Sequence, residues 1–212
     1  MTSALTHLFY VISTSLLVPV ELCLILTLLM ALRLLGVVAR ETLLRRRERP
    51  RRRELEARLE RREYEELALF LRDSSREGRA QPATSPLAAL AECVECACDE
   101  ALVEKRASEY ENGARATIER AERLAKVAPA LGLMGTLIPL GPALLGLAQG
   151  DMETLASNLV VAFSTTVVGL AGALVASFCA SVYRRWSRSD FVLVNFALDR
   201  LADAPHKTET QS

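Results

Sequence analysis

The sequence has few aromatic residues and only two histidines, and both shortages limit what it can encode. Aromatic side chains make up 5% of the 212 residues, which is too few for a large soluble core. The sequence contains no glycine-rich phosphate loop, no spacing typical of a catalytic triad and no histidine cluster. No motif in the sequence therefore indicates an enzymatic function, and we expect neither enzyme activity nor a cofactor.

The five cysteines do not form the pattern of a secreted disulfide framework. Cys23 and Cys179 lie in apolar segments, whereas Cys93, Cys96 and Cys98 form a C-x-x-C-x-C cluster in a polar one. Zinc or an iron-sulfur cluster needs about four ligands, and no second cysteine pair or nearby histidine completes the set. We therefore expect no metal site here and interpret the cluster as small packing residues in a subunit contact.

Charge is nearly absent from two long stretches, although a quarter of all residues are charged. Residues 129–183 contain only two charged residues, Asp151 and Glu153, and both fall near the middle. A bilayer core about 30 Å thick needs about 20 apolar residues per helical span. This stretch therefore predicts two spans joined by a short acidic turn, and the apolar run over residues 5–32 predicts one more.

The predicted fold is an all-α integral membrane protein with three transmembrane helices and a long helical cytoplasmic insert. Four parts follow along the chain: a first span (1–39), the insert (40–128), a transmembrane hairpin (129–185) and an amphipathic tail (186–212). Within the insert, residues 51–72 and 87–127 favour helix. The glycine and prolines between residues 74 and 86 predict a linker between these two helices.

Basic residues predict the orientation in the membrane. Residues 40–63 contain 11 arginines against 6 glutamates, and Arg184, Arg185 and Arg188 follow the last span. The positive-inside rule places both flanks in the cytoplasm, so the N-terminus and the turn at Asp151 lie outside. Because the arginine-rich run directly follows a span, its expected neighbours are the headgroups of the lipid bilayer and not nucleic acid.

Small residues gather on one face of each span of the hairpin. They recur at steps of three and four, which brings them to one side of a helix and permits close helix packing. In the second span they are Gly132, Gly135, Pro139, Pro142 and Gly146; in the third they are Asn158, Ala162, Thr165, Gly169, Ala173, Ala176 and Ala180, with Gly172 nearby. Spacing alone favours a packing contact between helices over the lining of a pore, but it does not decide between these two interpretations.

Two sequence segments carry a family resemblance. Gly132-Leu-Met-Gly-Thr136, followed by Ala162-Phe-Ser-Thr-Thr-Val-Val-Gly-Leu170, resembles the MotA/TolQ/ExbB proton channel family. The order of one span, a long insert and a two-span hairpin is similar too. The resemblance implies a ring-forming homo-oligomer, typically a pentamer, around single-span partners of the ExbD/TolR/MotB kind that carry an intramembrane Asp. It also implies that Thr136 and Thr166 line the proton route, beside Ser164 and Thr165.

The sequence departs from the family at one acidic position. Val161 stands where ExbB and TolQ members have a glutamate in the third span, although MotA-type members also lack it. Glu21 is then the only carboxylate within a predicted span, where a charge costs about 3 kcal/mol or more and is a functional candidate by default. Both a proton-handling role and a structural role fit Glu21.

The resemblance favours a stator-type subunit of an inner-membrane complex that uses the proton motive force to drive transport or mechanical work. Two alternatives remain open at the level of sequence. One is a structural membrane scaffold whose spans only anchor its charged helices, and the other is a small solute channel that needs no partner. A function that depends on the proton motive force would distinguish the stator-type subunit from the scaffold.

Overall fold

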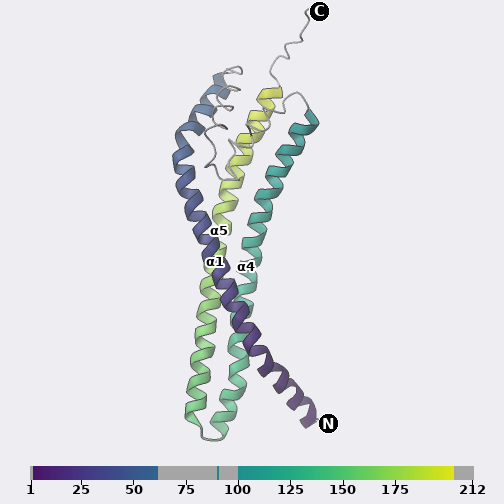
Figure 1. Ribbon diagram of the computed structural model, residues 1–212, viewed down its shortest axis with the longest axis vertical. Coiled ribbons are helices and arrows are strands. Elements are labelled where there is room, and N and C mark those ends of the chain that lie inside the picture. Colours follow the sequence, from purple (N-terminus) through teal and green to yellow (C-terminus); the bar gives the residue numbers. More distant parts are fainter. Residues whose placement is uncertain (1, 62–89, 91–99, 203–212) are drawn as a thin grey trace, which may run out of the picture. The chain divides into compact units, whose positions relative to one another are not determined.

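Three long helices form the described part of the protein. The computed structural model describes residues 2–61, 90 and 100–202. Helix α1 covers Thr2–Arg61, α4 covers Glu100–Ala148 and α5 covers Met152–Ala202 (Figure 1). Each contains a stretch that is long and apolar enough to cross a membrane. Within the described residues, the predictions of an all-helical fold and of three helices able to span a membrane are confirmed.

The helices run on past the ends of the predicted spans. α1 continues without a break through Pro50, although proline in a helix removes one backbone hydrogen bond. Pro50 is exposed, so water can satisfy the carbonyl that loses its partner. α5 likewise continues through Arg188 to Ala202, so the predicted tail helix is the end of this same helix. The predicted linker at residues 74–86 lies outside the described residues, as do Cys93, Cys96 and Cys98.

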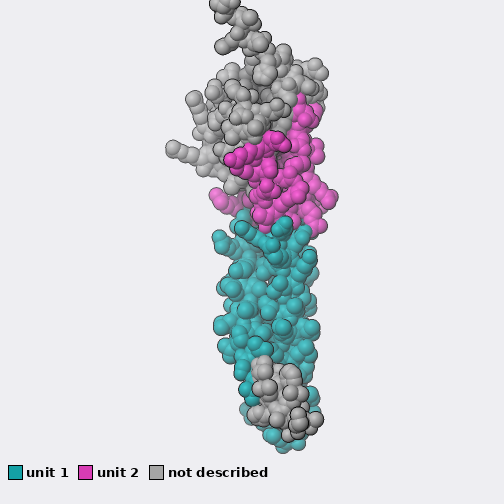
Figure 2. Space-filling view, turned by 90° about the vertical axis from the view of Figure 1, so that its right-hand side faces the viewer, with its two compact units in different colours: residues 1–37, 119–181 teal, residues 38–118, 182–212 magenta. Residues whose placement is uncertain are grey.

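The chain divides into two compact units, which Figure 2 colours separately. Unit 1 consists of residues 1–37 and 119–181, and unit 2 consists of residues 38–118 and 182–212. Each unit therefore combines segments that are far apart in the sequence. The charge-poor hairpin belongs to unit 1, whereas the arginine-rich half of α1 belongs to unit 2.

Unit 1 has a core of very small side chains. Its buried residues include Ala128, Ala143, Ala162 and Ala176. Large aliphatic and aromatic side chains point away from this core; Leu133, Leu137, Val160, Phe163, Val167 and Leu174 are all at least 60% exposed. The arrangement is inverted relative to a soluble protein and is typical of helices packed within lipid.

A tight turn joins the two helices of the hairpin. The backbone N–H of Asp151 donates to the carbonyl of Gly146 (2.9 Å) and that of Gly150 donates to Leu147 (3.1 Å), which is the Schellman pattern of a helix end. Gly150 has φ 76°, a conformation that residues with a side chain rarely adopt. Asp151 then caps α5 by accepting a hydrogen bond from the backbone N–H of Thr154 (3.0 Å). Its bonds from the side chain and backbone of Thr154 lower the pKa of the Asp151 carboxyl.

A buried carboxylate holds unit 2 together. Asp190 of α5 is completely buried. Its Oδ2 accepts a hydrogen bond from Arg45 at 2.7 Å, and its Oδ1 forms an ion pair with Arg52 at 2.8 Å. Tyr110 of α4 donates its hydroxyl to the same carboxylate at 3.4 Å. Side chains from all three helices therefore converge on one acidic group, and we call these four residues the Asp190 cluster.

Aromatic and apolar contacts surround the Asp190 cluster. The guanidinium carbon of Arg45 lies 4.7 Å from the centroid of the Trp186 ring, a distance at which the cation is attracted to the ring face. Trp186 in turn packs edge-to-face against Tyr183, with 5.6 Å between ring centroids. Leu55 and Val194 are also fully buried in this unit. These contacts shield the carboxylate from water, which strengthens the ion pairs and makes the loss of one partner costly.

Removing the carboxylate of Asp190 should strongly destabilise the protein. Asp190→Ala leaves the partly buried Arg45 and Arg52 without their carboxylate, and breaking a buried ion pair in this way costs about 3–5 kcal/mol. Thermal unfolding of the purified protein in detergent, followed by the fluorescence of Trp186, measures the loss. Trp186 is the only tryptophan in the chain and contacts Arg45 directly, so it reports on this cluster.

Asp199→Ala is the matched control, because Asp199 lies on the same helix and is exposed. It removes the same charge and should leave the unfolding temperature nearly unchanged. Equal unfolding temperatures for the two variants would show that the Asp190 cluster does not hold unit 2 together.

Candidate functional site in the transmembrane hairpin

Helices α4 and α5 approach each other closely where two glycines face each other. A methyl group built on Gly169 would lie 2.8 Å from both the carbonyl oxygen of Ala128 and the Cα of Gly132. A methyl group on Gly132 would lie 3.3 Å from the Cα of Gly169. The two backbones therefore touch directly, as small residues in membrane helices permit.

Two further glycines of α4 face threonines of α5 along the same line. A methyl group on Gly135 would lie 2.7 Å from the Cβ of Thr165, and one on Gly146 would lie 3.0 Å from the Cβ of Thr154. We call the line of contacts from Gly132 to Gly146 the glycine seam. Each glycine leaves a space that the opposing backbone or threonine fills.

The structure places the other predicted packing residues beside the glycine seam. Pro139 is fully buried and Pro142 is partly buried, both inside α4. Gly172 is buried as well, but a methyl group there would meet only the Cβ of Ala128 at 3.8 Å, an ordinary contact. Close packing is therefore concentrated at Gly132, Gly135, Gly146 and Gly169.

Two of the predicted pathway hydroxyls flank the contact at Gly132. Thr136 follows Gly132 by one helical turn, and the Cα of Thr166 lies 3.6 Å from where a Cβ on Gly132 would be. Both are partly buried. Thr136 donates its hydroxyl to the carbonyl of Leu133 (2.7 Å) and Thr166 donates to Ala162 (3.3 Å). Each hydroxyl thus keeps its oxygen available as an acceptor for another donor.

The other two predicted hydroxyls lie in different surroundings. Thr165 is partly buried against Gly135 within the glycine seam and donates to the carbonyl of Ala162 (2.8 Å). Ser164 is exposed and donates to Val160 (2.7 Å). Val161 is 37% exposed. The structure therefore separates one packing hydroxyl, Thr165, from an outward-facing one, Ser164.

Carboxylates are scarce in the apolar part of unit 1. Asp151 and Glu153 are both exposed at the turn of the hairpin. Glu21 of α1 is partly buried, and within the described residues its carboxylate forms no hydrogen bond or ion pair. The described residues also contain no group of three potential metal ligands. Between its turn and its charged flanks, the hairpin offers hydroxyls that can solvate a charge, and its carboxylates lie only at the turn.

Sequence reasoning missed two kinds of contact that the structure supplies. Thr154 donates its backbone N–H to the capping residue Asp151 and packs against Gly146, a role that the Asp-x-x-Thr spacing after Gly150 could have indicated. Asp190 was also missed. The sequence does place Asp190 three, four and seven residues before Leu193, Val194 and Ala197, and this spacing puts all four on one face of a helix. An acid on such an apolar face needs a buried partner.

These features define a class: a membrane protein with an α-helical hairpin packed on small residues, with hydroxyls beside the helix contact. The chain matches the MotA/TolQ/ExbB proton channel family over residues 77–193, which is more than half of its length. It belongs to that family. The match includes the whole hairpin and the Asp190 position. Comparisons with curated proteins and with solved structures each gave no match.

Adding one methyl group at Gly169 should separate the hairpin helices. In Gly169→Ala the new Cβ meets two backbone atoms, which cannot rotate away, so the helices must move apart. Overpacking of this kind costs about 1–3 kcal/mol. Unfolding of the purified protein, followed by loss of helical circular dichroism on heating, should show a lower midpoint.

Gly172→Ala provides the comparison one turn further along the same helix. It adds the same methyl group at a position with room for it, so its midpoint should stay close to that of the unmodified protein. A Gly169→Ala variant as stable as Gly172→Ala would mean that the backbones are not in direct contact.

Proposed function

We propose that this chain is a proton-channel or stator-type subunit of an inner-membrane complex that uses the proton motive force to drive transport or mechanical work. The observation that carries the proposal is the family match over a hairpin whose Thr136 and Thr166 flank the contact at Gly132. Hydroxyls at this position can line a polar route beside an otherwise apolar contact.

The proton-carrying group must come from a second polypeptide. Threonine hydroxyls accept and donate hydrogen bonds but do not change charge at physiological pH. The acids of the hairpin, Asp151 and Glu153, lie at its turn. We infer that a single-span partner of the MotB/ExbD/TolR kind brings an intramembrane aspartate to the level of Thr136 and Thr166.

The exposed apolar faces support an oligomer around that partner. Less than a third of each candidate span is buried within one chain. Several copies can share part of this surface and enclose a space that a single hairpin cannot. We propose a homo-oligomer, a pentamer by family resemblance, with one or two partner helices inside.

The partner's aspartate would alternate between two environments. Beside the threonine hydroxyls the ionised carboxylate is stabilised by hydrogen bonds, which favours the charged form. Against the exposed Leu, Val and Phe side chains the charged form is disfavoured, so the group takes up a proton there. Each protonation therefore changes which wall the partner helix prefers, and this preference couples proton flow to movement.

The orientation follows from the arginine bias: N-terminus outside, C-terminus and arginine-rich segments in the cytoplasm. An impermeant thiol reagent applied to intact cells tests it, in a variant whose native cysteines are serine. Gln149→Cys, at the turn of the hairpin, should react, and Arg53→Cys should not. The reverse labelling pattern would contradict the proposed orientation.

Replacing the two flanking hydroxyls should stop proton flow without affecting assembly. Valine has nearly the shape of threonine but lacks the hydroxyl, so Thr136→Val and Thr166→Val remove the polar groups and keep the packing. We expect proton flux through the complex, reconstituted with its partner in liposomes that enclose a pH-sensitive dye, to fall to the level of empty liposomes for Thr166→Val.

Thr27→Val is the control, because Thr27 of α1 also donates to a backbone carbonyl within its span, that of Leu24 at 2.8 Å. Its flux should stay normal. Normal flux in a Thr136→Val, Thr166→Val double variant would limit these hydroxyls to packing and favour a scaffold.

In the same assay Glu21→Gln, which cannot ionise, should reduce the flux; unchanged flux would give Glu21 a structural role.

A further inference from the structure

The arginines of α1 in unit 2 are divided between two faces of the helix. Arg45 and Arg52, seven residues apart, point inward and bind Asp190. Arg46, Arg49 and Arg53 follow the i, i+3, i+7 spacing of a single helical face and are exposed. None of these three forms an ion pair within the described part of the chain. The inward arginines stabilise the fold, and the outward ones serve no purpose within it.

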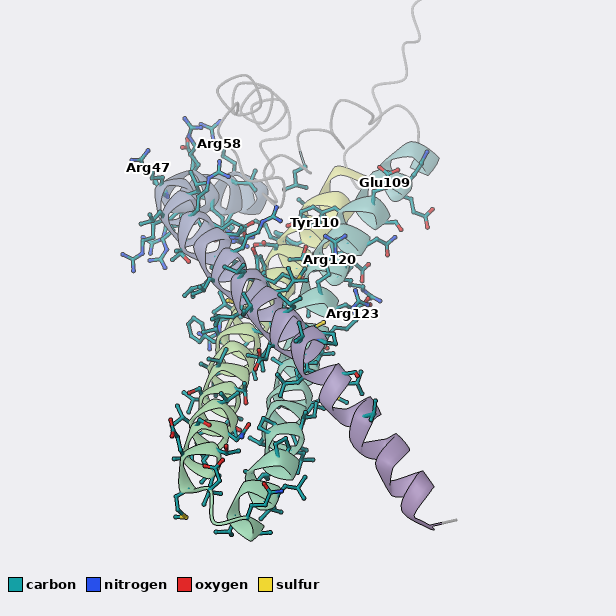
Figure 3. The ribbon with its side chains drawn as sticks, turned by 60° about the horizontal axis from the view of Figure 1, so that its bottom comes forward. Arg47, Arg58, Glu109, Tyr110, Arg120 and Arg123 are labelled. Carbon is teal, nitrogen blue, oxygen red and sulfur yellow. The ribbon has the colours of Figure 1, made fainter. Side chains whose placement is uncertain are left out.

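Helix α5 adds exposed arginines at the same level of unit 2. Arg45 contacts both Asp190 and Trp186, and Arg52 donates to the carbonyl of Ser189 at 3.2 Å, so α1 and α5 run side by side here. Arg185 and Arg188 of α5 are exposed. We call the exposed set the arginine belt; its members are Arg40, Arg46, Arg47, Arg49, Arg53, Arg185 and Arg188. Figure 3 shows the side chain of Arg47 pointing away from α1.

Acidic residues do not neutralise the arginine belt. Residues 40–53 contain only two acids, Glu41 and Glu48. α5 has no acid between Glu153 and Asp190, and the Asp190 carboxylate already pairs with Arg45 and Arg52. Beyond residue 53 the balance changes, since Arg58 pairs with Glu54 at 2.7 Å. On α4, Arg115 pairs with Glu111 and Arg123 with Glu119. Within the described helices, the surplus of positive charge therefore lies in residues 40–53 of α1 and 184–188 of α5.

We propose that the arginine belt binds the headgroups of anionic phospholipids. Guanidinium groups donate two parallel hydrogen bonds to phosphate oxygens, and these arginines follow the apolar runs of α1 and α5, where the helices would leave the bilayer core. A net negative headgroup gains from every arginine of the belt, whereas a zwitterionic one carries its own cation. This inference does not depend on proton conduction.

The test measures lipid binding to the complex as purified from its membrane. Native mass spectrometry in detergent counts bound phosphatidylglycerol and phosphatidylcholine during parallel titrations. We expect phosphatidylglycerol to bind more tightly than phosphatidylcholine by about tenfold or more. Arg46→Gln, Arg49→Gln and Arg53→Gln together should remove most of this preference, whereas the three corresponding lysine substitutions, which keep the charge, should retain most of it.

A second triple variant controls for total charge. Arg58→Gln, Lys105→Gln and Arg115→Gln remove three positive charges from unit 2 at positions outside the arginine belt. This variant should keep the lipid preference. Equal binding of the two lipids, or an equal loss in both triple variants, would overturn the proposal. Competition by inorganic phosphate at concentrations comparable to the lipid would also overturn it, because the ligand would then be free phosphate.

Discussion

The direct contact between the backbones of α4 and α5 at Gly132 and Gly169 is the constraint on which the membrane part of this protein depends. Every other placement in the hairpin follows from it. With backbones in contact, the next small residues must face Thr165 and Thr154, and the large aliphatic side chains are left on the outer faces. Thr136 and Thr166 come to lie at the edge of the contact, neither fully packed nor fully exposed.

Unit 2 is held by a different kind of interaction, although the same three helices supply it. Within lipid, helix association is not driven by the hydrophobic effect, and close packing at small residues is enough to hold α4 and α5 together. In unit 2 a single buried carboxylate joins α1, α4 and α5 through two arginines and a tyrosine. An ion pair of this kind is directional, since it fixes which arginines face inward. The remaining arginines of the same run are thereby turned outward.

Much of the fold could be predicted from the sequence because its signals were local. The apolar runs predicted three spans, and the spacing of glycines predicted the faces that the structure buries on α4. The continuity of α1 through Pro50 could not be predicted, because the cost of that proline depends on whether its neighbouring carbonyl can reach water. The Asp190 cluster joins residues 80 and 145 positions apart, and no local pattern encodes that pairing.

For the candidate site, sequence and resemblance named the hydroxyls but not their different surroundings. Consecutive residues 164, 165 and 166 point in three directions on a helix, so only the packing partner distinguishes them, and Thr165 is the one that Gly135 covers. The central claim is that a carboxylate from a second polypeptide carries the proton. It is tested most directly by measuring proton flux through the purified chain in liposomes, with and without a co-expressed single-span partner, and by weighing both intact complexes. The account predicts a closed oligomer that conducts only with the partner inside; a closed oligomer of this chain alone that conducts protons equally well would contradict it.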